Sequence, residues 1–186
     1  MRITEPLWSG IALAVGVASF VAGNVIAEVK RQLNPATQPI SAYLTGPYGV
    51  WESGGFLIFS LGLLALLGHG PVWWQAMVAA TAFSLWFVVL TKWLIKYGLY
   101  GWLLCRTAQQ LEDIHLVSAG IAFALAVGVE AVVLWGHYLA VALPFAAPFS
   151  ALIFTLFDRS QTAIEEKTYT IFLLLGMIAV IEVFLR

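Results

Sequence analysis

The sequence predicts an all-α membrane protein, a single bundle of six transmembrane helices. Of the 186 residues, 61% are hydrophobic and only 10% are charged, and the mean hydropathy is +0.91. Soluble domains carry about 25% charged residues, so this chain has too few charges to cover a surface that faces water. The hydrophobic residues also fall in long runs, each close to the roughly 20 residues that cross a bilayer as a helix.

The six predicted spans follow one another in one domain. They cover residues 7–27, 50–69, 71–95, 114–138, 139–157 and 168–185. The fifth span is the shortest and contains Pro144 and Pro148, which predicts a kinked or partly unwound helix. All but one of the eight tryptophans fall at or beside span ends, which is typical of an interfacial aromatic belt: Trp8, Trp51, Trp73, Trp74, Trp93, Trp102 and Trp135.

The distribution of basic residues predicts the orientation. Six spans place both termini on one side, where Arg2 and Arg186 are the only basic residues, whereas the loops after the odd-numbered spans gather the other seven. The positive-inside rule therefore predicts both termini outside, in a prokaryotic inner or plasma membrane.

Several function classes are excluded. The single cysteine, Cys105, rules out an intrachain disulfide and a CxxC redox pair. The chain has no HExxH, GxGxxG or P-loop motif, so no catalytic residue and no resident cofactor is predicted. The net charge of −1 gives no attraction to nucleic acid. The expected partners are membrane lipids, including bound lipid, and other membrane-protein subunits.

Two intramembrane carboxyls are the strongest candidates for function. Glu130 continues the row Ser118–Ala122–Ala126, so we expect it to face protein, about 6 Å from the middle of its span. Glu182 lies at a similar depth in the last span. Ionisable groups at such depth favour function, and two carboxyls at one level predict a shared proton or a coordinated cation. The alternatives are a Glu182–Arg186 ion pair and a protonated Glu130 that hydrogen-bonds to a neighbouring helix.

Histidines offer weaker candidates. His69 and His137 close the second and fourth spans, and two facing imidazoles at one level are the ligands of a b-type haem. The alternative is a pair of interfacial histidines that hydrogen-bond at helix ends. Glu112 and His115 have the Glu-x-x-His spacing of half a di-iron site, but no second copy exists. Acidic residues that complement the helix dipole in a first turn are the favoured interpretation.

Charged residues at the predicted cytoplasmic interface, the one at which His115 lies, are expected to form a solvated ring. They are Glu28, Lys30, Arg31, Glu52, Lys92 and Lys96. The segment between the third and fourth spans is expected to lie in the interface, and Thr107 with Gln110 predicts a capping box.

Small residues at four-residue spacing predict two helix-packing faces. These are Gly10, Ala14, Ala18 and Ala22 in the first span, and Gly120, Ala124 and Gly128 in the fourth. Packing inside the bundle and docking of a partner helix both remain open.

The stretch from residue 33 to 67 resembles an uncharacterised family of six-span prokaryotic membrane proteins, known as domain of unknown function 998. The resemblance rests on a Pro-Ile-Ser motif, a Gly-Pro/Gly turn, a pair of glycines and a histidine that opens the fourth span. These residues are Pro39, Ile40, Ser41, Gly46, Pro47, Gly49, Gly54, Gly55 and His115. Members often carry basic residues in the second and fourth loops, and this chain has none there. The resemblance implies a six-span fold and no particular reaction.

Three functions are compatible with the sequence. The first is a non-catalytic accessory subunit or assembly protein of a larger membrane complex. The second is a small transporter or a proton or cation pathway that uses Glu130 and Glu182. The third is a redox subunit that binds one b-type haem or a quinone.

Overall fold

The described residues form an all-helical fold, as the sequence predicts. The computed structural model describes residues 7–29, 44, 49–64, 66–67, 71–103, 105, 107–135, 142, 145–146 and 162–185. The helices in these ranges are α1 (Leu7–Val29), α3 (Gly49–Leu64), α4 (Val72–Lys96), a 3-10 turn (Tyr100–Leu103), α5 (Ala108–Val133) and α7 (Thr162–Leu185).

Three of these helices are long and apolar enough to cross a membrane. They are α1 over Trp8–Ile26, α4 over its whole length and α5 over its whole length. The apolar parts of α3 and α7 are shorter, and most of the predicted fifth span, 139–157, lies outside the described residues. The described helices are therefore consistent with a membrane protein, whereas they do not support a count of six spans.

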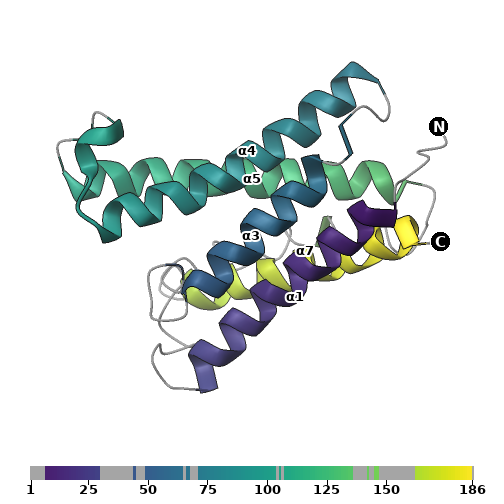
Figure 1. Ribbon diagram of the computed structural model, residues 1–186, viewed down its shortest axis with the longest axis horizontal. Coiled ribbons are helices and arrows are strands. Elements are labelled where there is room, and N and C mark those ends of the chain that lie inside the picture. The colour runs from purple at the N-terminus through teal and green to yellow at the C-terminus, as the bar shows by residue number, and fades with distance from the viewer. Residues whose placement is uncertain are drawn as a thin grey trace.

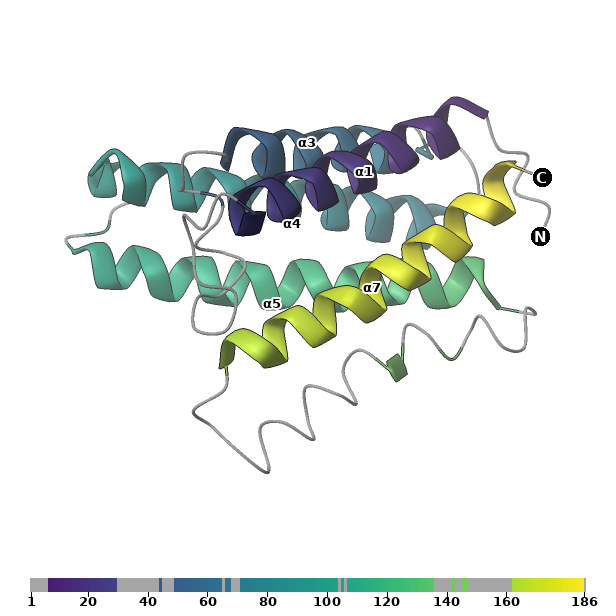
Figure 2. The same cartoon turned by 90° about the horizontal axis from the view of Figure 1, so that it is seen from below.

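The helices form two antiparallel pairs and a fifth helix that crosses them. Helix α1 packs along α3, and α4 packs along α5 (Figure 1). Helix α7 lies against α1 and α5 (Figure 2). The buried core between the pairs is apolar and draws on all five helices. Helix α7 runs in the same direction as α5, so its end lies at the same end of the molecule as the start of α1 (Figures 1 and 2).

Glycines bring α1 and α3 close together. A Cβ placed on Gly16 would lie 2.7 Å from the backbone nitrogen of Phe59, and one on Gly55 would lie 2.7 Å from the backbone nitrogen of Phe20. Real Cβ atoms do not approach backbone atoms so closely, so only glycine permits this contact. The pair is stabilised further where Phe20 and Phe56 meet edge to face at 5.1 Å.

The helix-packing face predicted on α1 is only partly correct. Gly10 is buried and Ala14 and Ala22 are half-buried, but Ala18 is exposed. The buried row passes instead through residues spaced three and four apart, which follows the 3.6-residue helical period: Ser9, Leu13, Gly16, Phe20 and Gly23.

The predicted face on α5 is mostly turned outward. Gly120 and Ala124 are exposed, and only Gly128 lies close to a neighbour, the sulfur of Met77. Helix α5 instead buries the parallel row that leads from Ser118 through Ala122 to Ala126.

Helix α5 begins where its capping residues predict. Thr107 is the N-cap residue, and its side-chain oxygen accepts a hydrogen bond from the backbone nitrogen of Gln110 at 3.2 Å. Before this cap, Gly98 adopts a φ of 68°, which turns the chain out of α4. Because α5 starts at Ala108, the helix is displaced toward the N-terminus relative to the predicted span 114–138.

One tryptophan does not belong to the expected belt. Trp74 is fully buried in the core, because it lies on the side of α4 that faces the other helices. The belt tryptophans that the structure shows as exposed are Trp8, Trp51, Trp73, Trp102 and Trp135.

Candidate functional site

The candidate site centres on the carboxyl group of Glu130. This residue is fully buried near the end of α5, at the end of the row Ser118–Ala122–Ala126. The prediction that Glu130 faces protein is therefore confirmed. Neither of its carboxyl oxygens has a hydrogen-bond partner within the described part of the chain. Burial of a carboxyl without such partners is unfavourable, and it is most unfavourable when the carboxyl carries a charge.

Gly176 of α7 supplies the space for this carboxyl. A Cβ placed on Gly176 would overlap Oε2 and the carboxyl carbon of Glu130. The glycine is buried, and its neighbour Met177 belongs to the core. The contact between α5 and α7 is thus shaped around the Glu130 side chain.

An apolar cavity lies one helical turn from the site. Its volume is about 50 Å³, and all five described α-helices contribute to its lining. Ala126, one turn before Glu130, and Met177 both line it, and Thr170 is the only polar side chain among the lining residues. The cavity is large enough for water. Because its walls offer almost no hydrogen bonds, the cavity would not hold a water molecule in a fixed position.

The structure does not bring Glu182 to this site. Glu182 is exposed, whereas Glu130 is fully buried. Glu182 lies six positions after Gly176, and at about 100° per residue this places it roughly 240° around α7. The predicted pair of carboxyls at one level is therefore not formed, because the two groups lie in different environments.

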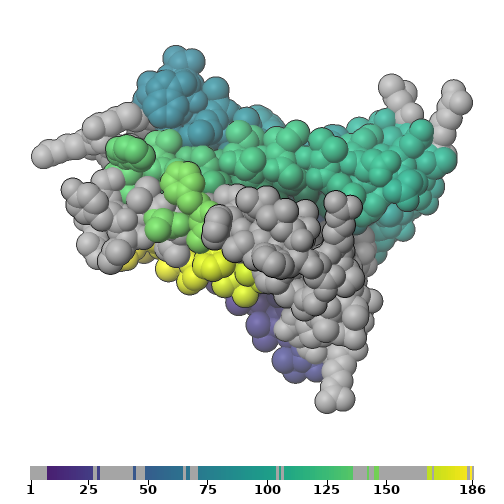
Figure 3. Space-filling model, turned by 180° about the vertical axis from the view of Figure 1, so that it is seen from behind, coloured from purple at the N-terminus to yellow at the C-terminus, as the bar shows by residue number. Residues whose placement is uncertain are grey.

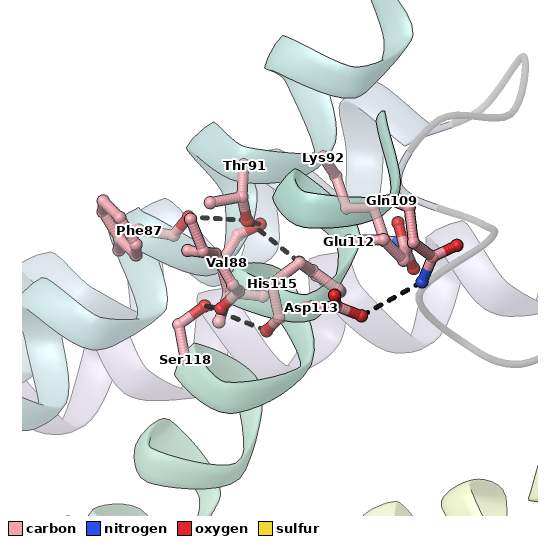
Figure 4. Close-up of polar contacts among 10 residues, drawn as sticks. Phe87, Val88, Thr91, Lys92, Gln109, Glu112, Asp113, His115 and Ser118 are labelled. Atoms are coloured by element: carbon pink, nitrogen blue, oxygen red, sulfur yellow. Dashed lines mark hydrogen bonds and ion pairs between the residues drawn. The ribbon is translucent and has the colours of Figure 1, made fainter. Parts of the chain in front are cut away.

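A second set of polar side chains joins the C-terminal part of α4 to the N-terminal part of α5. Lys92 Nζ donates a hydrogen bond to Glu112 Oε1 at 2.5 Å. One residue away, Thr91 Oγ1 lies 3.0 Å from His115 Nδ1 (Figure 4). The Thr91 hydroxyl also lies 3.0 Å from the carbonyl oxygen of Phe87. When the hydroxyl donates to this carbonyl, it accepts a hydrogen bond from the Nδ1–H of His115.

These contacts correct the interpretation of Glu112 and His115. Helix α5 begins at Ala108, so Glu112 lies beyond the first turn and has no dipole-complementing position there. It neutralises Lys92 instead. Glu112 and His115 contact different partners on α4 (Figure 4), and no three residues of metal-binding type come together in the described ranges. These observations do not support half of a di-iron site.

The expected solvated ring of charge is also wrong for two of its members. Glu52 is fully buried beside Gly23, and Lys92 is 7% exposed. Lys96 is exposed and lies over the rings of Trp93 and Tyr97 at 5.9 and 5.8 Å. The side chains of Glu28, Lys30 and Arg31 lie outside the described residues.

Two buried charges are thus revealed by the structure. The burial of Lys92 has a signal in the sequence, because Val78, Leu85 and Val88 precede it on the same helical face. The burial of Glu52 has a weaker signal, since it depends on the glycine of another helix. The proposed haem ligands His69 and His137 lie outside the described residues.

The chain matches no known family model, no curated protein and no solved structure. The resemblance to domain of unknown function 998 therefore stays a prediction.

Proposed function

We propose that this chain is a multi-pass membrane protein that moves a proton or a small cation by exchange at Glu130. The observation that carries the proposal is the complete burial of the Glu130 carboxyl at the contact between α5 and α7. An acidic side chain inside a membrane bundle costs a few kcal/mol, and this one serves no described hydrogen bond or ion pair. A carboxyl in this position suits a site that binds and releases a cation.

The direction of the helices supports an even number of crossings. Helix α5 ends at the end of the molecule where α1 starts, and α7 starts at the opposite end (Figure 2). The end of α5 and the start of α7 therefore lie at opposite ends of the described helices. The predicted fifth span, 139–157, falls between these two helices in the sequence, so we propose six crossings with both termini outside.

The contact with α7 gives a route for release. Because Gly176 leaves no side chain between the helices, a small displacement of α7 changes the space around the carboxyl directly. The apolar cavity beside Ala126 and Met177 provides volume into which neighbouring side chains can move. The closed arrangement then holds the neutral carboxyl, and charged Glu130 requires the opened arrangement.

The test is ion movement in reconstituted vesicles. Purified protein is placed in liposomes that contain a pH-sensitive dye, and an imposed pH or sodium gradient is followed with and without a membrane potential. We expect Glu130→Gln to abolish movement and Glu182→Gln to leave it unchanged, because Glu182 is exposed. Equal rates for the wild type and Glu130→Gln would refute the proposal.

An accessory-subunit role is the second candidate. It is supported by the outward position of Gly120 and Ala124, which leaves a smooth strip on α5 where a partner helix can approach. Purification in a mild detergent tests it: a partner in fixed stoichiometry, lost in Gly120→Leu, supports this role. The redox role rests on His69 and His137, and a visible spectrum of the same preparation tests it.

A further inference from the structure

A groove on the outer side of the α4–α5 pair is a second feature, independent of Glu130. Its volume is about 510 Å³, within the range of pockets that bind small molecules. One wall is formed by α4 and the other by α5, with lining residues Phe83, Ser84, Phe87, Asp113, Ile114, Val117, Ser118 and Ile121. The groove therefore belongs to two of the three helices that are apolar enough to cross a membrane.

The long sides of the groove are apolar and open outward. Phe83, Val117 and Ile121 are 59%, 64% and 50% exposed. The hydroxyl of Ser118 donates to the carbonyl oxygen of Ile114 at 2.8 Å, so the helix itself satisfies this group. Helix α5 lies along the surface of the molecule on the face shown in Figure 3. In a bilayer, this surface faces hydrocarbon.

One end of the groove carries a charge. Asp113 lines it and accepts a hydrogen bond from Gln109 Nε2 at 3.0 Å (Figure 4). The neighbouring cation, Lys92, is already bound to Glu112. Among the residues that the structure describes, the charge that this end presents to a ligand is therefore negative.

The dimensions fit one lipid chain. Asp113 and Ile121 are eight residues apart on α5, which corresponds to about 12 Å along the helix. One leaflet contributes half of a hydrocarbon core about 30 Å thick. A chain that starts at Asp113 and follows the groove to Ile121 thus stays within a single leaflet.

From this arrangement we infer that the groove binds a phospholipid whose headgroup carries a primary ammonium. The acyl chain lies between Phe87 and Val117, and the ammonium group lies beside the Asp113 carboxylate. The negative charge of Asp113 disfavours anionic phospholipids that lack an ammonium group, such as phosphatidylglycerol.

The experiment measures lipid retention by native mass spectrometry. Protein is reconstituted with equal amounts of phosphatidylethanolamine and phosphatidylglycerol, released in a mild detergent, and analysed for bound lipid. We expect one retained phosphatidylethanolamine for each chain. Asp113→Asn should lower the preference over phosphatidylglycerol by about threefold, the size expected for one exposed ionic contact.

A matched pair of tryptophan variants tests the groove itself. Val117→Trp fills it, whereas Leu116→Trp adds the same bulk at an adjacent exposed residue that does not line it. We expect retention to fall at least fivefold in Val117→Trp and to stay unchanged in Leu116→Trp. Equal retention in these two variants, or a headgroup preference that Asp113→Asn leaves unchanged, would overturn the inference. Ion movement that persists in Val117→Trp separates this site from Glu130.

Discussion

The structure accommodates its buried ionisable residues in different ways. Lys92 is paired with Glu112 across α4 and α5, so each charge lowers the cost of burying the other. Glu130 has no such partner among the described residues, and it occupies space that Gly176 provides. At the residue scale, the first arrangement stabilises the helix pair, and the second is the observation on which the proposed exchange at Glu130 rests.

Replacement of Gly176 tests whether the α5–α7 contact is shaped around Glu130. Gly176→Ala should destabilise the protein by about 1–3 kcal/mol, the usual cost of an overpacked core. In a Glu130→Ala background the added methyl group has space, so most of this cost should disappear. The measurement is a double-mutant cycle on the free energy of unfolding in detergent. Additive effects of the two substitutions would show that the groups do not interact.

Removal of Glu112 should be more damaging than removal of its neighbour. Glu112→Gln leaves Lys92 buried without its charged partner, so we expect a loss of about 1–3 kcal/mol in the free energy of unfolding. Asp113→Asn changes an exposed carboxylate and should cost less than about 0.5 kcal/mol. Thermal unfolding of both variants, side by side, gives the comparison. Equal midpoints would contradict the assigned role of the Lys92–Glu112 pair.

At the scale of elements, the α1–α3 pair depends on glycine. Gly55 meets the backbone of Phe20, but a Cβ on the adjacent Gly54 would meet nothing within 4 Å. A side chain can therefore be accommodated at Gly54 but not at Gly55, although the two residues are neighbours in the same helix.

Alanine substitutions should separate the two glycines. Gly55→Ala should destabilise the protein by about 1–3 kcal/mol through overpacking. Gly54→Ala should be neutral or stabilising by up to about 1 kcal/mol, because alanine is the better helix former. Unfolding in detergent measures both. A larger loss in Gly54→Ala than in Gly55→Ala would mean that the α1–α3 contact is arranged differently.

The sequence predicts what depends on local periodicity. The apolar runs locate all five described α-helices, the Thr107 cap locates the start of α5, and the row before Glu130 predicts that this residue faces protein. Pair contacts are harder to predict, because they depend on which helix lies opposite. The burial of Glu52 and Trp74 and the exposure of Ala18 and Glu182 are of this kind. Residues four apart do not stay on one face of a helix with 3.6 residues per turn. This explains why the buried row of α1 differs from the predicted row of small residues.

At the scale of the whole molecule, the ends of the described helices define two opposite sides. The end of α4 at Lys96 and the end of α5 near Trp135 lie at opposite ends of the bundle (Figure 1). The positive-inside count predicts that the Lys96 end faces the cytoplasm.

Introduced cysteines test this orientation. In a Cys105→Ser background, Trp135→Cys should react with a membrane-impermeant maleimide in intact cells. Lys96→Cys should react only after the cells are permeabilised. Both positions are exposed, so access to the reagent decides the result. The reverse pattern would show the opposite orientation, and reaction of both in intact cells would contradict a bundle that spans the membrane.

We propose that Glu130 exchanges a proton within the bundle, and the chemical reactivity of this carboxyl tests the proposal most directly. A membrane-soluble carbodiimide reacts with protonated carboxyl groups in apolar surroundings. The protein in lipid vesicles is treated over a range of pH, and the modified residue is located by mass spectrometry. We expect modification of Glu130 at a rate that falls as the pH rises, because only the protonated carboxyl reacts. A Glu130 that stays unmodified, or that reacts at a rate independent of pH, would contradict it.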